Sequence, residues 1–271
     1  MQTKTFKLLE YQPTHFEEAI STVSLPQDYR MLPLVHCASL EEREGQVTAG
    51  EILRSGRITP SMCDVFCENL IYTYVGRPAY RESRLPVCFV MKPLESLLQN
   101  IFVFDTGAYS NKRYSKLMDN FQDVDVYRIP ADRESIGRFI LKYFGGNENY
   151  FYSDPSEYSQ DINEESLEEF SYDVFRHLRG FTGMGFDDRC RTLENIIRGE
   201  ILLRDTLQCV IYPDSMCRMN EFLRNYPEIP RDTVILNYED RDGGASPEEC
   251  QQALNLILHR YYEKMGFFAA G

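Results

Sequence analysis

Short runs of apolar residues, many of them alternating with polar ones, dominate the pattern of this chain. Residues 69–75 are the clearest case, because Tyr72 and Tyr74 fall on one side of an extended chain and Thr73 falls on the other. Residues 86–91 are apolar almost throughout, which is typical of a strand buried on both faces. The same reasoning predicts strands at residues 31–36, 101–104, 201–203, 208–212 and 233–236.

Apolar residues at helical spacing mark fewer segments. Residues 132–144 repeat apolar side chains every three or four positions, which predicts an amphipathic helix. Before the last helix, Ser246 and Glu249 have the spacing of a capping box. Further helices are predicted over residues 47–54, 167–178 and 247–262.

Strands and helices do not alternate regularly, which favours an α+β fold over a doubly wound sheet. The sequence has no GxGxxG or P-loop segment, so we do not expect a Rossmann or Walker phosphate site. Residues 1–30 are predicted to be an N-terminal arm, in which Pro13 and Pro26 interrupt any long element. Residues 31–271 are predicted to form a single domain with an acidic surface excursion near residues 145–165.

The composition is that of a folded protein, with 43% hydrophobic residues among 271. No apolar run reaches the roughly 20 residues of a membrane helix, and the N-terminus lacks a signal-peptide core, so we expect a soluble, cytoplasmic protein. The eight cysteines show no paired framework or zinc-ribbon spacing, which favours reduced thiols and no metal site. The net charge of −13 argues against a broad grip on nucleic acid, but it allows local capture of one nucleotide or docking onto a basic partner.

Three separated segments carry candidate chemistry. In the first, a strand ends at His36, Ser39 follows shortly after it, and a helix-like stretch comes next. In the second, an aromatic strand leads into Arg77, and in the third, Glu194 lies among arginines and a strand follows. Taken singly, each has a structural explanation: a core histidine bonded to backbone groups, a half-buried strand, and a surface glutamate paired with a neighbouring arginine.

Together and in this order, the three segments resemble the ADP-ribosyltransferase superfamily, most closely the DarT-type enzymes that modify nucleic acids. The resemblance implies an ADP-ribosyltransferase-like split β-sandwich with flanking helices, with NAD as co-substrate. It also implies a toxin or phage-defence effector. Residue 192 is Thr, so the chain has no Glu-x-Glu pair there, and arginine-directed protein modification is not expected.

The resemblance also implies a role for each residue. His36 and Ser39 would contact the ribose or nicotinamide. An aromatic ring stabilises a cationic nicotinamide, and Tyr72 is our first choice, with Tyr74 and Tyr80 as alternatives. Arg77 would pair with a phosphate through its planar guanidinium. Glu194 would orient the ribose 2′-hydroxyl and stabilise the positive charge that grows at the anomeric carbon.

The acceptor of the ADP-ribose stays open at this point. The resemblance implies a base of DNA or RNA, whereas the acidic charge keeps a protein acceptor or plain NAD hydrolysis in view. An acidic surface also suits docking by an antitoxin or another complex partner. The alternative from another class is a non-catalytic interaction module of a defence complex. The two classes differ in whether Glu194 lies beside His36 in one cleft.

Overall fold

The computed structural model describes residues 4–40, 47–78, 86–111, 123–152, 188–216 and 218–268. Within these ranges, one mixed sheet has the strand order β11-β10-β5-β1-β4-β8-β6-β7, and β3 joins it at β4. The strands are β1 (Leu34–Ser39), β3 (Ser61–Cys63), β4 (Glu68–Val75), β5 (Pro86–Met91), β6 (Ile101–Phe102), β7 (Arg128–Ile129), β8 (Glu194–Ile197), β10 (Leu207–Pro213) and β11 (Val234–Tyr238). A separate short ladder pairs β2 (Arg57–Ile58) with β9 (Ile201–Leu202).

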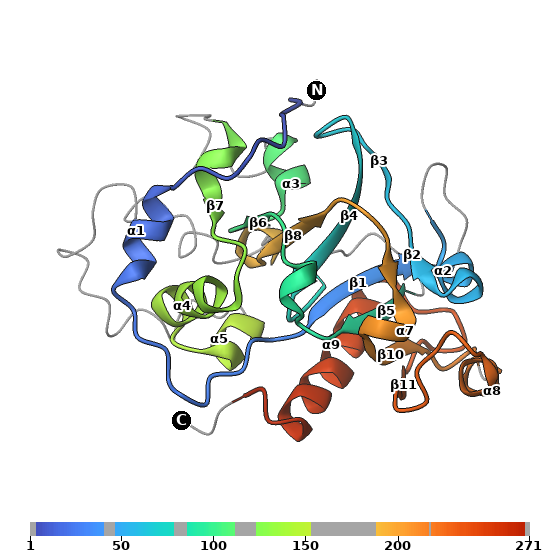
Figure 1. The fold of residues 1–271 in the computed structure, drawn as a ribbon. Coiled ribbons are helices and arrows are strands. Elements are labelled where there is room, and N and C mark those ends of the chain that lie inside the picture. Colours follow the sequence, from blue (N-terminus) through green and yellow to red (C-terminus); the bar gives the residue numbers. More distant parts are fainter. Residues whose placement is uncertain are drawn as a thin grey trace.

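Helices cover the sheet in separate groups (Figure 1). The long helix α9 packs on β5, β10 and β11, whereas α1 contacts α4 and β7, and α4 contacts α5. The α-helices are α1 (His15–Ser21), α2 (Ala49–Ser55), α3 (Thr106–Ser110), α4 (Arg133–Phe144), α5 (Asn147–Tyr152), α7 (Leu203–Thr206), α8 (Met219–Asn225) and α9 (Pro247–Lys264). Short 3-10 turns lie at η1 (Glu95–Leu97), η3 (Val124–Tyr127) and η5 (Asp188–Arg191). This arrangement of a mixed sheet with flanking helices confirms the α+β class.

Local capping signals in the sequence correspond to helix ends in the structure. Ser246 and Glu249 form both hydrogen bonds of the capping box at α9, as expected. Asp132 caps α4 by accepting from the backbone N–H of Ser135 at 2.7 Å. Gly56 ends α2 in the left-handed region with φ 66°. There, an added Cβ would lie 2.5 Å from the Cβ of Glu228, so a glycine is needed.

Several boundaries differ from the prediction. The first strand begins at Leu34 rather than at residue 31, and β6 ends at Phe102. The predicted surface excursion is wrong over its described part, because residues 147–152 form α5 and bury Tyr150 and Phe151 in the core. Aromatic rings such as those of Tyr150 and Phe151 bury a large apolar surface, and this favours packing into the core over an exposed loop. The remainder of that excursion and the predicted helix at 167–178 lie outside the described residues.

The N-terminal arm belongs to the same hydrophobic core as the rest of the described chain. Phe16 and Ile20 of α1 are fully buried, and the Phe16 ring lies 6.0 Å from that of Phe139 on α4. Thr14 donates to the carbonyl of Arg128 at 2.7 Å and so ties the arm to β7 at the edge of the sheet. Residues 4–30 therefore cover a sheet edge rather than extend away from it.

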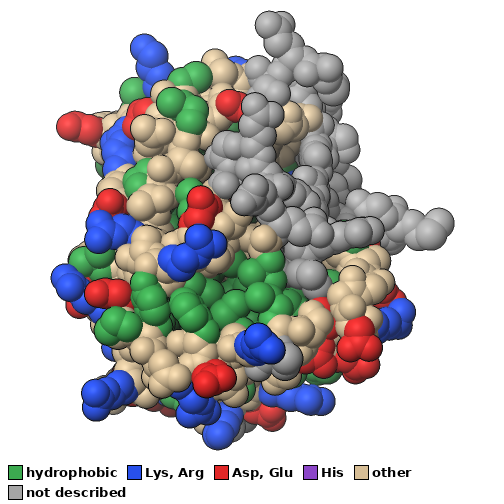
Figure 2. Space-filling model, turned by 90° about the vertical axis from the view of Figure 1, so that its right-hand side faces the viewer, with side chains coloured by type: hydrophobic (Ala, Val, Ile, Leu, Met, Phe, Trp, Pro, Cys, Tyr) green, Lys and Arg blue, Asp and Glu red, His purple; other side chains and the backbone are tan. Residues whose placement is uncertain are grey.

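No helix among the described residues has both the length and the apolar composition needed to cross a bilayer. On the face that Figure 2 shows, hydrophobic side chains gather in one area, and acidic and basic side chains are interspersed around it. No broad basic surface appears among the described residues of that face.

Candidate active site

The site begins where β1 and β4 stop pairing. Their register covers Leu34 opposite Val75 and Val35 opposite Tyr74, and it goes no further, although β1 stays paired with β5 up to Ser39. The imidazole of His36 lies at this divergence and contacts the carbonyl of Tyr72 through Nδ1 at 2.8 Å. The His36 side chain thus makes a hydrogen bond with a backbone carbonyl of β4 that the backbone of β1 no longer reaches.

This contact fixes the tautomer of His36. A carbonyl oxygen only accepts, so Nδ1 carries the proton, and Nε2 of the neutral ring is an acceptor. Burial lowers the pKa of His36, and the hydrogen bond to Tyr72 only partly opposes that effect. The ring is therefore neutral at pH 7, with its acceptor nitrogen on the side away from Tyr72.

Two tyrosines of β4 line the same space, because alternate residues of a strand share a face. The hydroxyl of Tyr72 makes a short hydrogen bond with the thiol of Cys63 on β3. The hydroxyl of Tyr74 donates to Oδ2 of Asp105 at 2.7 Å. Tyr72 is half-buried, whereas Tyr74 is buried. Both rings are thus held by their hydroxyls, and the Tyr72 ring keeps an accessible part.

Glu194 is the first residue of β8, the strand that lies between β4 and β6, and its side chain is buried. It lies opposite Tyr74 on β4 and opposite Phe102 on β6, and its exposed fraction is 1%. Its Oε2 accepts from the backbone N–H of Thr106 at 3.0 Å and from the Thr106 hydroxyl at 2.7 Å. The alternative interpretation of Glu194 as a surface residue paired with a neighbouring arginine is therefore wrong. Glu194 is buried, and Arg198 pairs with Glu68.

Burial raises the pKa of Glu194 well above its usual range, and the negative charge of Asp105 raises it further. The two bonds from Thr106 favour the ionised form and offset only part of this. In the ligand-free protein Glu194 therefore holds its proton to a higher pH than an ordinary glutamate does. Perturbed carboxyls of this kind gather at functional sites.

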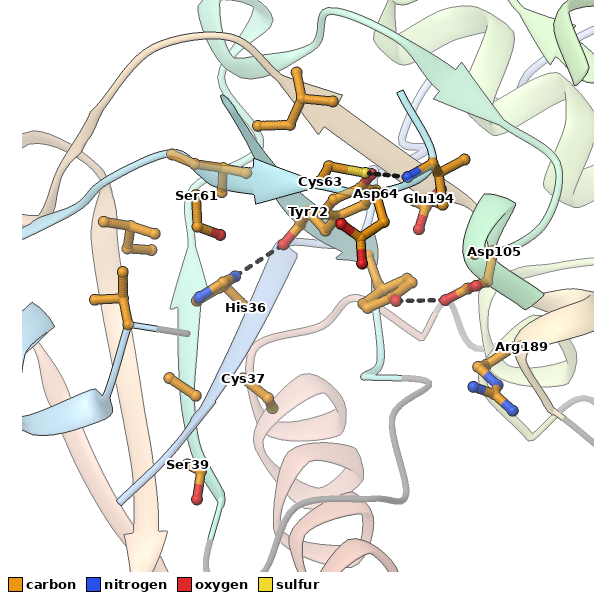
Figure 3. Close-up of a pocket in the computed structure, with 18 of the residues that line it drawn as sticks. His36, Cys37, Ser39, Ser61, Cys63, Asp64, Tyr72, Asp105, Arg189 and Glu194 are labelled. Carbon is orange, nitrogen blue, oxygen red and sulfur yellow. Dashed lines mark hydrogen bonds between the residues drawn. The ribbon is translucent and has the colours of Figure 1, made fainter. Parts of the chain in front are cut away.

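A cavity of ≈ 450 Å³ brings most of the predicted residues together (Figure 3). This volume lies in the range of small-molecule sites. Of the residues predicted from sequence, the cavity is lined by His36, Ser39, Tyr72, Tyr74 and Glu194.

Comparisons of the chain with protein-family models, with curated proteins and with solved structures find no match.

One predicted residue, Arg77, stands apart from the cavity. Arg77 does not line it; its side chain is 5% exposed and Nη2 donates to the hydroxyl of Thr192 at 3.3 Å. Gly76, with φ 76°, turns the chain at the end of β4, and an added Cβ there would lie 2.7 Å from Cδ1 of Leu32. Tyr80 lies outside the described residues.

The structure adds residues that the sequence pattern did not select. Asp105 and Arg189 line the cavity beside Glu194, and Cys63 and Asp64 line it from β3 and the turn that follows. Among its described lining residues, Arg189 is the one arginine or lysine. An acidic residue just before a short helix is a capping signal in the sequence, and that signal was available for Asp105. No group of three or more potential metal ligands occurs among the described residues.

Proposed function

We propose that the protein is an NAD-dependent ADP-ribosyltransferase whose site is this cavity. One observation carries the proposal: His36, Tyr72 and Glu194 come from three neighbouring strands, β1, β4 and β8, and line a single cavity. They are far apart in the sequence, and they are the residues on which the resemblance rests. A non-catalytic module has no need for a buried carboxyl beside an accessible aromatic ring.

The sheet supports the finer fold assignment, a split β-sandwich. β1, β5, β10 and β11 stay together on one side of the divergence, and β4, β8, β6 and β7 stay together on the other. Only two residue pairs join the halves at β1 and β4. The proposed NAD-binding crevice is the opening between the halves, where His36 bridges to Tyr72.

His36 and Tyr72 bind the nicotinamide riboside in this proposal. Nε2 of His36 accepts a hydrogen bond from a ribose hydroxyl, because its partner nitrogen already donates to the backbone. The Tyr72 ring stacks on the nicotinamide, which carries a positive charge and gains from a π surface. Ser39 lies on the same strand as His36 and supplies a further hydroxyl at the cavity wall.

Glu194 supplies the electrostatic part of the reaction. The bond between the anomeric carbon and the nicotinamide nitrogen breaks, and its electron pair leaves with neutral nicotinamide. Positive charge then develops on the ribose, where a carboxylate stabilises it. The cationic nicotinamide favours the ionised form of a nearby carboxyl, so NAD binding brings the raised pKa of Glu194 down. The acceptor then attacks the anomeric carbon and releases its proton.

Arg189 is better placed than Arg77 for the phosphates, because it lines the cavity from η5 (Figure 3). A guanidinium binds a phosphate with two parallel hydrogen bonds. Arg77, buried against Thr192, holds the end of β4 instead. We therefore propose Arg189 as the phosphate ligand in place of Arg77.

The acceptor proposed from the resemblance is a base of DNA or RNA, in a toxin or phage-defence setting. The net charge of −13 limits any contact with nucleic acid to the neighbourhood of the site. A protein acceptor and NAD hydrolysis are the other two outcomes that the experiment below separates. A basic antitoxin or complex partner fits the same overall charge.

The test is nicotinamide release from NAD by the purified protein, followed by chromatography, with DNA, RNA, protein extract or no acceptor. Glu194→Gln keeps the size of the side chain and removes its charge, so we expect release to fall about 100-fold or more. Glu200→Gln is the matched control, because Glu200 is exposed and pairs with Arg57 on the surface. The acceptor that accelerates release identifies the substrate. No release by wild-type protein under any of these conditions, with intact folding, refutes the transferase and favours the interaction module.

A further inference from the structure

Asp105 joins three elements around the cavity. It follows β6 and begins α3, with an exposed fraction of only 4%. One carboxylate oxygen accepts from the hydroxyl of Tyr74 on β4 at 2.7 Å, and the other accepts from the backbone N–H of Ala108 at 2.6 Å. Its own backbone N–H donates to the carbonyl of Arg189 in η5 at 3.0 Å. A buried carboxylate bonded in this way fixes the relative positions of all three elements.

The residue after Asp105 holds Glu194. The backbone N–H and the hydroxyl of Thr106 both donate to Oε2 of Glu194, at 3.0 and 2.7 Å. The direction of the Thr106 N–H depends on how α3 starts, and Asp105 caps that start. Glu194 and Tyr74, which face each other on β8 and β4, are therefore held by two consecutive residues, the first residue of α3 and its N-cap.

We propose that Asp105 is a positioning residue of the site: its carboxylate holds the Tyr74 ring and the start of α3, and through α3 it holds the carboxyl of Glu194 in place. The inference rests on the proposed function, because that function requires the carboxyl of Glu194 to lie at a fixed position beside the ribose. Asp105 acts through Tyr74 and Thr106 in this inference, without bonding to the reacting sugar.

The charge of Asp105 gives this role a measurable signature. Two buried carboxyls repel each other when both ionise, and the charge of Asp105 contributes to the raised pKa of Glu194. Replacing Asp105 with an uncharged residue should therefore lower the pKa of Glu194. The other titratable or charged groups that line the same cavity are His36, Cys37, Cys63, Asp64, Tyr72, Tyr74 and Arg189. None of these residues is replaced in the Asp105 variant.

The experiment compares wild type, Asp105→Asn and Tyr74→Phe by the pH dependence of kcat/KM for nicotinamide release. Asparagine still caps α3, so it removes the charge while keeping the backbone bond. We expect Asp105→Asn to lower the plateau about 10- to 100-fold, because it frees the Tyr74 ring that lies opposite Glu194, and to move the acidic limb to lower pH. Tyr74→Phe removes the same hydrogen bond but keeps the charge, so its plateau falls while its acidic limb stays. An equal loss at every pH, without a shift of the limb, indicates a merely structural role and overturns the inference.

A second readout does not depend on NAD chemistry. Carboxyl signals of protein labelled with ¹³C on Glu and Asp are titrated by NMR without ligand, and Glu194→Gln assigns the Glu194 signal. We expect Glu194 to titrate at lower pH in Asp105→Asn than in wild type. The same midpoint in both proteins overturns the inference, whether or not the protein releases nicotinamide. Failure of the proposed function shows instead as an inactive wild type, so the two failures are distinguishable.

Discussion

Tyr74 and Glu194 lie directly opposite each other on β4 and β8, and their side chains bond to two consecutive residues, the N-cap and the first residue of α3. Tyr74 reaches Asp105, and Glu194 reaches Thr106. A buried carboxyl is thereby placed beside a second one, which no requirement of stability explains. Natural proteins keep such arrangements where a site needs them, at a cost to stability.

The first prediction concerns that cost. The pKa of Glu194 is higher in the folded than in the unfolded chain, so the folded state binds more protons, and its stability falls as the pH rises above about 4.5. Glu194→Gln removes this loss, since the amide cannot ionise. We expect the variant to be more stable than wild type at pH 8, and we expect the difference to shrink as the pH falls toward 4. Urea unfolding at both pH values measures the difference. A variant less stable than wild type at pH 8 contradicts the assignment.

The second prediction separates the ring of Tyr72 from its hydroxyl. If the ring stacks on nicotinamide, Tyr72→Phe keeps that interaction and changes KM for NAD by less than about threefold. Tyr72→Ala removes about 0.5–1.5 kcal/mol of stacking, so KM rises about two- to tenfold or more. Tyr152→Ala is the control, because that ring is 56% exposed and does not line the cavity. Equal KM values in all three variants would show that Tyr72 does not stack on the nicotinamide, and the test would pass to Tyr74.

Much of the fold could be predicted because its signals are local. The six residues of β5 are all apolar and buried, so their run marks the strand with its observed bounds. The caps of α4 and α9 lie within four residues of the groups that they bind. In contrast, β8 has only four residues, and it is a strand because β4 and β6 flank it on either side. Pairing partners so distant in sequence leave no mark on the segment itself.

The residues of the site also divide into those that local signals predict and those that depend on contacts between distant segments. His36 and Tyr72 lie on strands that the pattern predicts, so their convergence follows from strand order once the sheet is known. Asp105 reaches Tyr74 across 31 positions of sequence, and no spacing rule connects the two. The resemblance implies a phosphate-binding role for Arg77 at the end of the aromatic strand, yet the left-handed Gly76 precedes Arg77, and the Arg77 side chain lies against Thr192. The alternation of side chains predicts the face on which a residue lies only within a strand, and Arg77 lies beyond the end of β4.

The third prediction concerns Tyr150, which links the ends of β4 and β8. Its hydroxyl donates to the carbonyl of Val75 at 3.1 Å and accepts from the backbone N–H of Leu193 at 2.8 Å. Tyr150→Phe leaves the buried N–H of Leu193 without this acceptor, so we expect a loss of about 1–3 kcal/mol in the free energy of unfolding. Tyr152→Phe, at an exposed hydroxyl two residues away, should change it by less than about 0.5 kcal/mol. Equal effects of the two variants would show that Tyr150 does not support β8.

The last prediction decides between two arginines. Arg77 is buried and bonded to Thr192, so its role in our proposal is to hold the end of β4. Arg189 lines the cavity and is the proposed phosphate ligand. We expect Arg77→Met to lower the free energy of unfolding by about 1–3 kcal/mol and to leave KM for NAD unchanged. Arg189→Met should raise KM about tenfold or more, because it removes a charge-assisted bond to a phosphate.

Urea unfolding and the kinetics of nicotinamide release, measured on both variants, give the two quantities side by side. A raised KM in Arg77→Met with unchanged stability would restore Arg77 as the phosphate ligand and remove Arg189 from that role.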